Sequence, residues 1–129
     1  MEKWKLGMGA SVDAMNEVHR DLLGQIYALL TGSDDDVAQR MEHLVELMER
    51  DFREEEELME QIKFPGIRAH MEQHARVLAA LHRIEPGDVP AARAALVLLP
   101  QWFELHLATL DQALAEALVV AAAQDGPAH

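Results

Sequence analysis

Apolar residues recur every three or four positions along most of this chain, the spacing that places side chains on one face of an α-helix. The pattern is clearest between residues 41 and 59, where the apolar positions are Met41, Leu44, Val45, Met48, Phe52, Leu58 and Met59. Turn-forming residues interrupt the pattern at 31–33, near Pro65 and at 85–88. The sequence therefore predicts four helices, at about residues 14–30, 36–62, 65–84 and 90–123.

Short connections between consecutive helices favour antiparallel neighbours. We therefore expect a single all-α domain over residues 1–129, folded as an up-down-up-down antiparallel four-helix bundle. Pro100 lies inside the fourth predicted helix and should kink it or split off its first turns. Gly7 and Gly9 disfavour a helix before Ala14, so residues 1–13 are expected to form an extended N-terminal arm.

Composition narrows the classes of partner. Half of the 129 residues are apolar, which is sufficient for one packed core, and the formal net charge is -12. Such a charge repels nucleic acids and anionic membranes, so we expect neither as a partner. No apolar stretch reaches the roughly 18–20 residues that span a bilayer, and the N-terminus does not resemble a signal peptide. Without cysteine, disulfides and thiolate ligands are excluded. We expect a soluble, cytoplasmic monomer.

Histidines and carboxylates are spaced so that they can converge inside such a bundle. The set comprises His19, Asp51, Glu55, His70, His74, His106 and Asp111. His70 and His74 stand four residues apart and face the same way, and Asp51 lies one turn before Glu55. Glu55 precedes Pro65 by about as many residues as His74 follows it, so the second and third helices place them at one level. Imidazole and carboxylate groups are the ligands of iron, manganese and zinc.

The spacing of His106 and Asp111 is unusual for two residues of one helix whose side chains are to reach the same site. Five residues of ideal helix rotate by about 500°, which leaves the two side chains about 140° apart. Either the two side chains flank a site between them or a π-bulge brings them together. We predict a local irregularity of the helix between Leu107 and Leu110.

Five segments together resemble the hemerythrin family, in particular its bacterial single-domain members. They are Asn16-x-x-His19-x-x-Leu22, Asp51-Phe52-x-x-Glu55-Glu56-x-Leu58-Met59, Phe64-Pro65, His70-x-x-x-His74 and Trp102-x-x-x-His106-x-x-x-x-Asp111. The resemblance extends from Trp4 to about Leu118. It implies a non-haem centre of two iron ions, oxo- or hydroxo-bridged when oxidised.

The resemblance also implies a role for each ligand. His70, His74 and His106 would hold one iron, and Glu55 and Asp111 would bridge the two. His19 would hold the second iron, which keeps an open position for O2. The family's second histidine on that iron falls at position 51, where this chain has aspartate.

Asp51 leaves several interpretations open. It either binds the second iron, or leaves a gap filled by water, or binds only one metal state, or is a solvated acid of an acidic helix. His43, Glu54 and Tyr27 are too far away or face another direction, so none replaces the missing histidine. If Asp51 binds, its negative charge favours the ferric state, which shifts the site from reversible O2 carriage toward oxidase, peroxidase or sensing behaviour.

Apolar residues surround the predicted ligands. Phe52, Trp102, Phe103 and Leu107 occur at helical spacing and are expected in the core, and the resemblance implies that some also wall the O2 pocket. Glu56 matches an acid of the family, either beside a ligand or on the surface. His43, His82 and His129 have no evident partner and are expected to face solvent.

Three functions from different classes remain. The leading hypothesis is a di-iron protein that binds O2 for storage, delivery or sensing, with no catalytic residues. The alternative is a di-iron oxidase or peroxidase, or an enzyme that acts on NO, which Asp51 favours. The third is a metal buffer or a site for another metal, since ligand identity alone does not exclude manganese or zinc.

Overall fold

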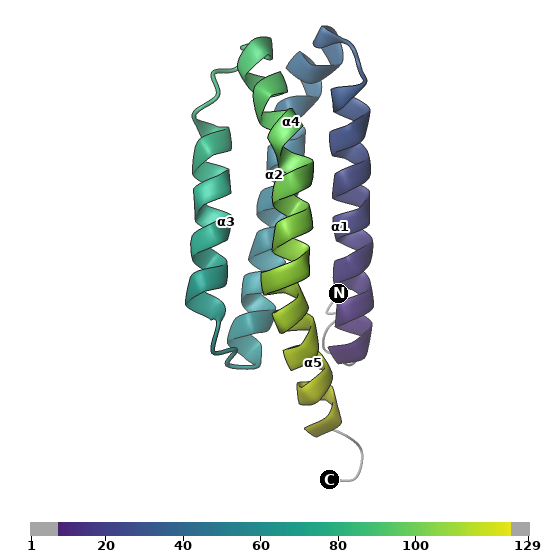
Figure 1. Ribbon diagram of the computed structural model, residues 1–129, viewed down its shortest axis with the longest axis vertical. Coiled ribbons are helices and arrows are strands. Elements are labelled where there is room, and N and C mark those ends of the chain that lie inside the picture. The colour runs from purple at the N-terminus through teal and green to yellow at the C-terminus, as the bar shows by residue number, and fades with distance from the viewer. Residues whose placement is uncertain (1–7, 125–129) are drawn as a thin grey trace.

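The computed structural model describes residues 8–124, which form helices and short connections (Figure 1). The helices are α1 (Met8–Leu30), α2 (Asp34–Gln61), α3 (Ile67–His82), α4 (Val89–His106) and α5 (Gln112–Gln124). A π-helical turn, η2 (Leu107–Asp111), joins α4 to α5, so that these three elements run as one long rod. Helix α1 packs against α2, α4 and α5, and α2 packs against α3 and α4. The predicted four-helix bundle is confirmed.

Polar side chains cap the starts of α2 and α4. The side chain of Ser33 caps α2 by accepting a hydrogen bond from the Asp36 N–H at 3.1 Å, and the first turn of α2 carries Asp34, Asp35 and Asp36. These negative charges stabilise the positive end of the helix dipole. Asp88 caps α4 in the same way through the N–H of Ala91.

The N-terminus differs from the prediction. Helix α1 begins at Met8, so residues 8–13 are helical and the expected arm is wrong there; residues 1–7 lie outside the described part of the chain. Gly9 falls in the first turn, and the cost of one glycine in a helix is only about 1 kcal/mol. Val12 and the buried Met15 pack into a core cluster, which favours the additional turns.

Pro100 does not split the fourth helix, because α4 continues through it. Residues on both sides of it are buried in one cluster, namely Leu96, Leu99 and Phe103. This shared burial holds the two halves of α4 together across the hydrogen bond that proline cannot make.

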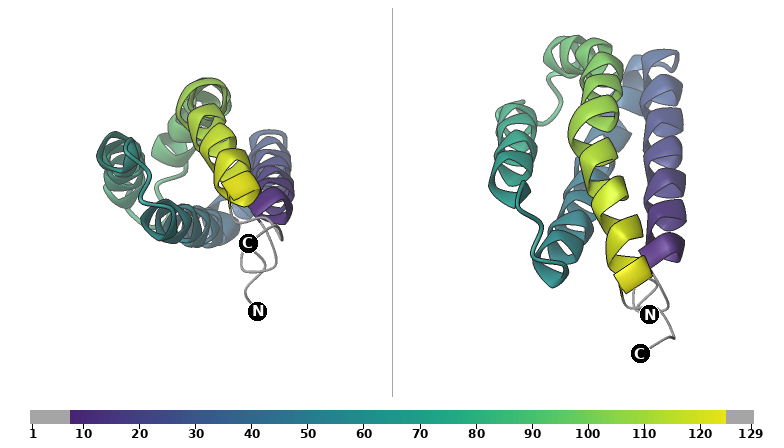
Figure 2. Two further views of the ribbon diagram at one scale, coloured as in Figure 1. Left: turned by 90° about the horizontal axis from the view of Figure 1, so that it is seen from below. Right: turned by 60° about the horizontal axis from the view of Figure 1, so that its bottom comes forward.

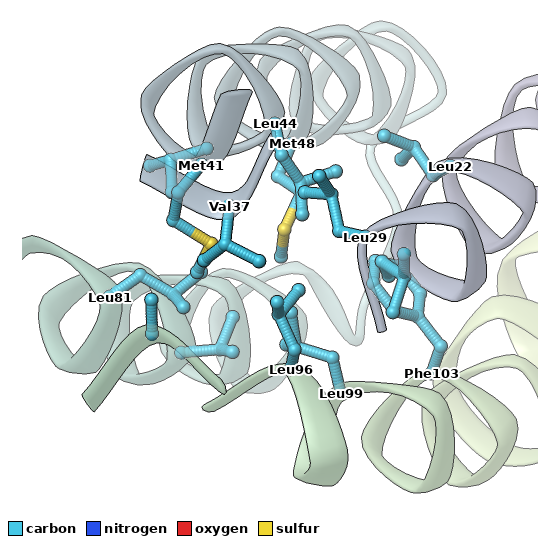
Figure 3. Close-up of a cluster of buried hydrophobic side chains, with 14 of the residues drawn as sticks. Leu22, Leu29, Val37, Met41, Leu44, Met48, Leu81, Leu96, Leu99 and Phe103 are labelled. Atoms are coloured by element: carbon cyan, nitrogen blue, oxygen red, sulfur yellow. The ribbon is translucent and has the colours of Figure 1, made fainter. Parts of the chain in front are cut away.

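Two apolar clusters form the core and leave a gap between them along the bundle. The larger cluster draws on α1, α2, α3 and α4 and includes the side chains labelled in Figure 3. The smaller one consists of Met15, Leu58, Met59, Leu114 and Leu118. On α1, α2 and the α4–α5 rod, the predicted metal ligands fall in sequence between residues of the larger cluster and residues of the smaller one. The fold therefore places a polar layer inside an apolar core.

None of the helices in the described part of the chain combines the length and the apolar character that crossing a membrane requires.

Viewed along the bundle in Figure 2, α3 lies beside α2 and away from α1. The ligands on α3 therefore approach the polar layer from the opposite side to His19.

Candidate metal centre

All seven predicted ligands are buried and lie in one cluster. His19 comes from α1, Asp51 and Glu55 from α2, and His70 and His74 from α3; His106 ends α4 and Asp111 ends η2. Each is at most 4% exposed to solvent. Burying so many ionisable groups is costly unless they pair with one another or bind metal ions.

Three imidazoles face one another across the cluster. The Nε2 atom of His106 lies 3.1 Å from Nε2 of His70 and 3.2 Å from Nε2 of His74. Two nitrogen ligands at right angles, each about 2.1 Å from one metal ion, would stand about 3 Å apart. These three nitrogens therefore form one face of a coordination site, which we call the three-histidine position.

Carboxylate oxygens complete this position. Oε1 of Glu55 lies 3.1 Å from Nε2 of His74, and Oδ1 of Asp111 lies 2.8 Å from Nε2 of His70 and 3.1 Å from Nε2 of His106. Five potential ligand atoms, three nitrogens and two oxygens, thus lie together.

A second group of donors adjoins the first. It contains His19, Asp51 and Glu55, and we call it the one-histidine position. The Nε2 atom of His19 contacts Oε2 of Glu55 and lies 3.1 Å from Oδ2 of Asp51. Oδ2 of Asp111 lies 3.5 Å from Nδ1 of His19. Glu55 thus turns one oxygen toward each group, as a carboxylate that bridges two metal ions does, whereas Asp111 belongs to the first group and its second oxygen lies beside the other ring nitrogen of His19.

The predicted helix irregularity is confirmed. Residues Leu107–Asp111 form a π-helical turn, in which the N–H of Gln112 donates to the carbonyl of Leu107 five residues back. The wider turn offsets the rotation that five residues would otherwise produce. It brings Asp111 onto the face of the rod that carries His106.

Burial and mutual attraction shift the pKa values of the cluster. Burial lowers the pKa of His19, but its contacts with Asp51 and Glu55 outweigh this and raise the pKa to about 11. Contacts with Asp111 and Glu55 likewise overcome burial at His70 and raise its pKa to about 9. Metal-free chains therefore hold protons at nitrogen atoms that a metal ion would occupy.

The carboxylates respond in two directions. Burial raises the pKa of Asp51 to about 6, against the opposing attraction of His19. At Glu55 the neighbouring histidines outweigh burial and hold the pKa well below its usual range, and at Asp111 His106 and His70 also lower it.

The donor set fits metal ions. Among the described residues, Oδ2 of Asp51, Oε1 of Glu55 and both oxygens of Asp111 are buried without a well-aligned hydrogen-bond partner. Buried polar atoms are rarely left in this condition. Coordination of a metal ion would satisfy each of these oxygens, and the fit is therefore to a metal site rather than to a closed network of hydrogen bonds.

Two outer residues orient the histidines. Nδ1–H of His74 donates to Oε2 of Glu56 at 3.0 Å, and Nδ1–H of His106 donates to Oε1 of Gln73 at 3.1 Å. Such bonds fix the tautomer and turn Nε2 toward the metal. Glu56 therefore lies beside a ligand, as one of its two sequence-based interpretations proposed. Gln73 was missed, because its contact with His106 joins two helices that are far apart in sequence and becomes visible only in the folded chain.

Aromatic rings cover one side of the cluster. Phe52 stacks on His74 with ring centroids 3.9 Å apart, and Trp102 stacks on His106 at 4.5 Å. Phe103 is buried, and the centroid of its ring lies 6.5 Å from that of the His19 ring. Leu107 is half-buried, at the start of the π turn. Apolar rings in these places exclude water from the donors.

The remaining histidines lie outside the cluster. His43 and His82 are exposed, as predicted, but each has an acidic partner. Nδ1 of His43 lies 3.8 Å from Oε1 of Glu46, and Nε2 of His82 lies 3.1 Å from Oε2 of Glu49. His129 lies outside the described residues. A cavity of about 360 Å³ opens beside His82, between α2 and the α3–α4 connection, and none of the seven ligands lines it.

Comparison with known proteins gives one relevant similarity. The chain is 26% identical to a bacteriohemerythrin of Ralstonia nicotianae over 129 aligned positions, which cover 97% of this chain and 91% of that protein. No protein-family model matches the chain, and no solved structure matches it. The aligned region covers nearly the whole of both proteins, so all seven predicted ligand positions lie within it.

Proposed function

We propose that this chain is a hemerythrin-like protein that holds two iron ions and binds O2. The full-length similarity to a bacteriohemerythrin and the buried cluster of histidines and carboxylates support this proposal. The observation that carries the proposal is the split of seven buried donors into two adjoining groups, with Glu55 facing both. Storage, delivery or sensing of O2 would all use such a site.

Each donor has a role in this proposal. His70, His74 and His106 would hold one iron, His19 and Asp51 would hold the other, and Glu55 and Asp111 would bridge the two. A pair of ferrous ions supplies the two electrons that reversible O2 uptake requires. Glu56 and Gln73 keep the imidazoles of His74 and His106 in the orientation that presents Nε2 to the metal.

The number of donors indicates where a small ligand would enter. The three-histidine position has five donor atoms, whereas the one-histidine position has Nε2 of His19, an oxygen each from Asp51 and Glu55, and the nearby Oδ2 of Asp111. The second position is therefore less completely filled by the protein. Phe103 beside His19 and the neighbouring rings exclude bulk water, which slows proton entry.

The proposal is tested by loading the metal-free chain with Fe(II) in the absence of air and measuring bound iron. We expect about two ions per chain, because the donors form two groups. Adding O2 should then produce a visible absorption band that disappears when O2 is removed, and a zinc-loaded sample should produce none. Retention of no iron, or iron without any response to O2, would contradict the proposal.

Asp51 supports a second candidate, a di-iron oxidase or peroxidase, or an enzyme that acts on NO. It is 4% exposed and contacts His19 within the cluster, so its charge acts directly on the one-histidine position. An additional anionic donor favours the higher oxidation state of the metal. Irreversible conversion to a ferric spectrum in the O2 experiment would favour this candidate.

The monomeric state and the cytoplasmic location stay predictions.

A further inference from the structure

The two positions of the cluster differ in the numbers of nitrogen and oxygen atoms that they offer to a metal ion. At the three-histidine position, three of the five donor atoms are nitrogens. At the one-histidine position, Nε2 of His19 is the single nitrogen, and Asp51 and Glu55 supply oxygens. The aspartate at position 51 enlarges this difference, since a histidine there would bring the nitrogen donors of the one-histidine position to two.

Donor type determines which divalent ion a position favours. Imidazole suits iron and zinc, whereas carboxylate suits manganese, and Mn(II) stands at the weak end of the affinity series for nitrogen-containing sites. The advantage of iron over manganese therefore grows with the number of nitrogen ligands. It should be large at the three-histidine position and small at the one-histidine position.

The negative charges in the cluster also favour manganese at the one-histidine position. Three carboxylates are buried together, and their ion-pair partners among the described residues are all histidines of the cluster rather than lysine or arginine. Metal ions are thus the cations that would balance these charges. Asp51 adds its charge on the nitrogen-poor side, where a hard, oxygen-preferring ion gains most from it.

We propose that the chain assembles a mixed centre when both metals are available, with iron at the three-histidine position and manganese at the one-histidine position. The inference rests on the proposed function only in that two metal ions bind in this cluster. It concerns the selection of metals and requires no reaction with O2.

The experiment loads the metal-free chain, in the absence of air, with one equivalent per chain each of Fe(II) and Mn(II), and measures both metals after unbound ions are removed. We expect about one iron and one manganese per chain. Crystals of this sample, measured on both sides of the iron and manganese absorption edges, should show manganese beside Asp51 and iron among the three histidines.

Two variants separate the type of donor from its charge. Asp51→His adds a nitrogen, so the ratio of bound manganese to iron should fall about tenfold. Asp51→Asn keeps an oxygen but removes the charge, so manganese uptake should fall less. Glu57→His is the matched control, because it also replaces a carboxylate by an imidazole but at an exposed position of α2 outside the cluster, and its ratio should equal that of the unaltered chain.

Loading with iron alone distinguishes this inference from the proposed function. If iron alone gives fewer than two ions per chain, the di-iron proposal fails, and the mixed centre fails with it only if the mixed sample also binds fewer than two ions per chain. If iron alone gives two ions but the mixed sample contains only iron, or shows manganese equally at both positions, the mixed centre is overturned and the di-iron proposal stands. The crystal measurement needs only the unaltered chain, so it decides the matter even where a variant does not fold.

Discussion

Asp51 is the residue that most distinguishes this site from the family pattern it otherwise resembles. Its side chain is buried and in contact with His19, so the interpretation of Asp51 as a solvated surface acid is wrong. Because Asp51 is anionic whereas a histidine ligand is neutral, it should stabilise the ferric state relative to the ferrous one. A single residue therefore bears on both the choice of metal and the lifetime of the reduced site.

The first prediction concerns this lifetime. We expect Asp51→His to slow the spontaneous oxidation of the iron-loaded, O2-exposed chain, because a negative charge that favours Fe(III) is removed. A barrier raised by ~1.4 kcal/mol would slow the reaction about tenfold. The decay of the O2-dependent absorption band in air measures the rate. Oxidation as fast as in the unaltered chain would refute the prediction, and Glu57→His again serves as the control.

The outer partners of the histidines give a second prediction. Glu56→Ala and Gln73→Ala should each weaken metal binding at the three-histidine position by about 10–100-fold, the range typical of lost outer hydrogen bonds. The reason is that His74 and His106 would no longer be held in the required tautomer and orientation. Competition with a chelator measures the affinity. Glu57→Ala should change little, and an equal loss there would show a general effect of acidic charge instead.

At the scale of helices, the sequence predicted the elements well and their ends less well. Periodicity identified four helices, because buried apolar positions such as Leu44 and Met48 must share one face. The start of α1 was placed too late, since the packing of Val12 and Met15 against the C-terminal rod is a contact between segments far apart in sequence. Gln73 escaped notice for the same reason.

The irregular turn was predictable because it follows from spacing alone. Two inward-facing residues five positions apart do not share a face of a regular helix, whereas a π turn allows it. The turn amounts to one additional residue inserted into a helix whose two flanks keep their faces. His106 and the buried Leu114 can thus both point inward from one rod.

Deletion of single residues tests this description. Removing Ala108, an exposed residue of η2, should convert the turn into ordinary α-helix and leave His106, Asp111 and the α5 core residues facing inward. Removing Ala113, an exposed residue of α5, should rotate Leu114 and Leu118 out of the core at a cost of roughly 1.5–3 kcal/mol for each leucine. Thermal unfolding and metal content measure both effects. Equal destabilisation by the two deletions would contradict the insertion.

In the whole molecule, a polar layer interrupts the apolar core between two clusters. Without metal, protons take the place of cations in this layer, because contacts with the carboxylates raise the pKa of His19 to about 11 and that of His70 to about 9. The stability of the metal-free bundle therefore depends on pH in a direction that these shifts define.

For a histidine whose pKa in the folded chain exceeds its value of about 6.5 in the unfolded chain, the stabilising contribution is complete below pH 6.5 or so. It is lost as the pH rises through about 9 for His70 and about 11 for His19. Bound metal ions replace these protons, and at higher pH fewer protons must be displaced for metal to bind. The increase in Tm on metal loading should therefore grow from about pH 6 to about pH 9. Thermal unfolding of metal-free and metal-loaded chains, in the absence of air, measures this increase. An increase that stays constant or shrinks over that range would mean that protons do not occupy the metal positions of the empty cluster.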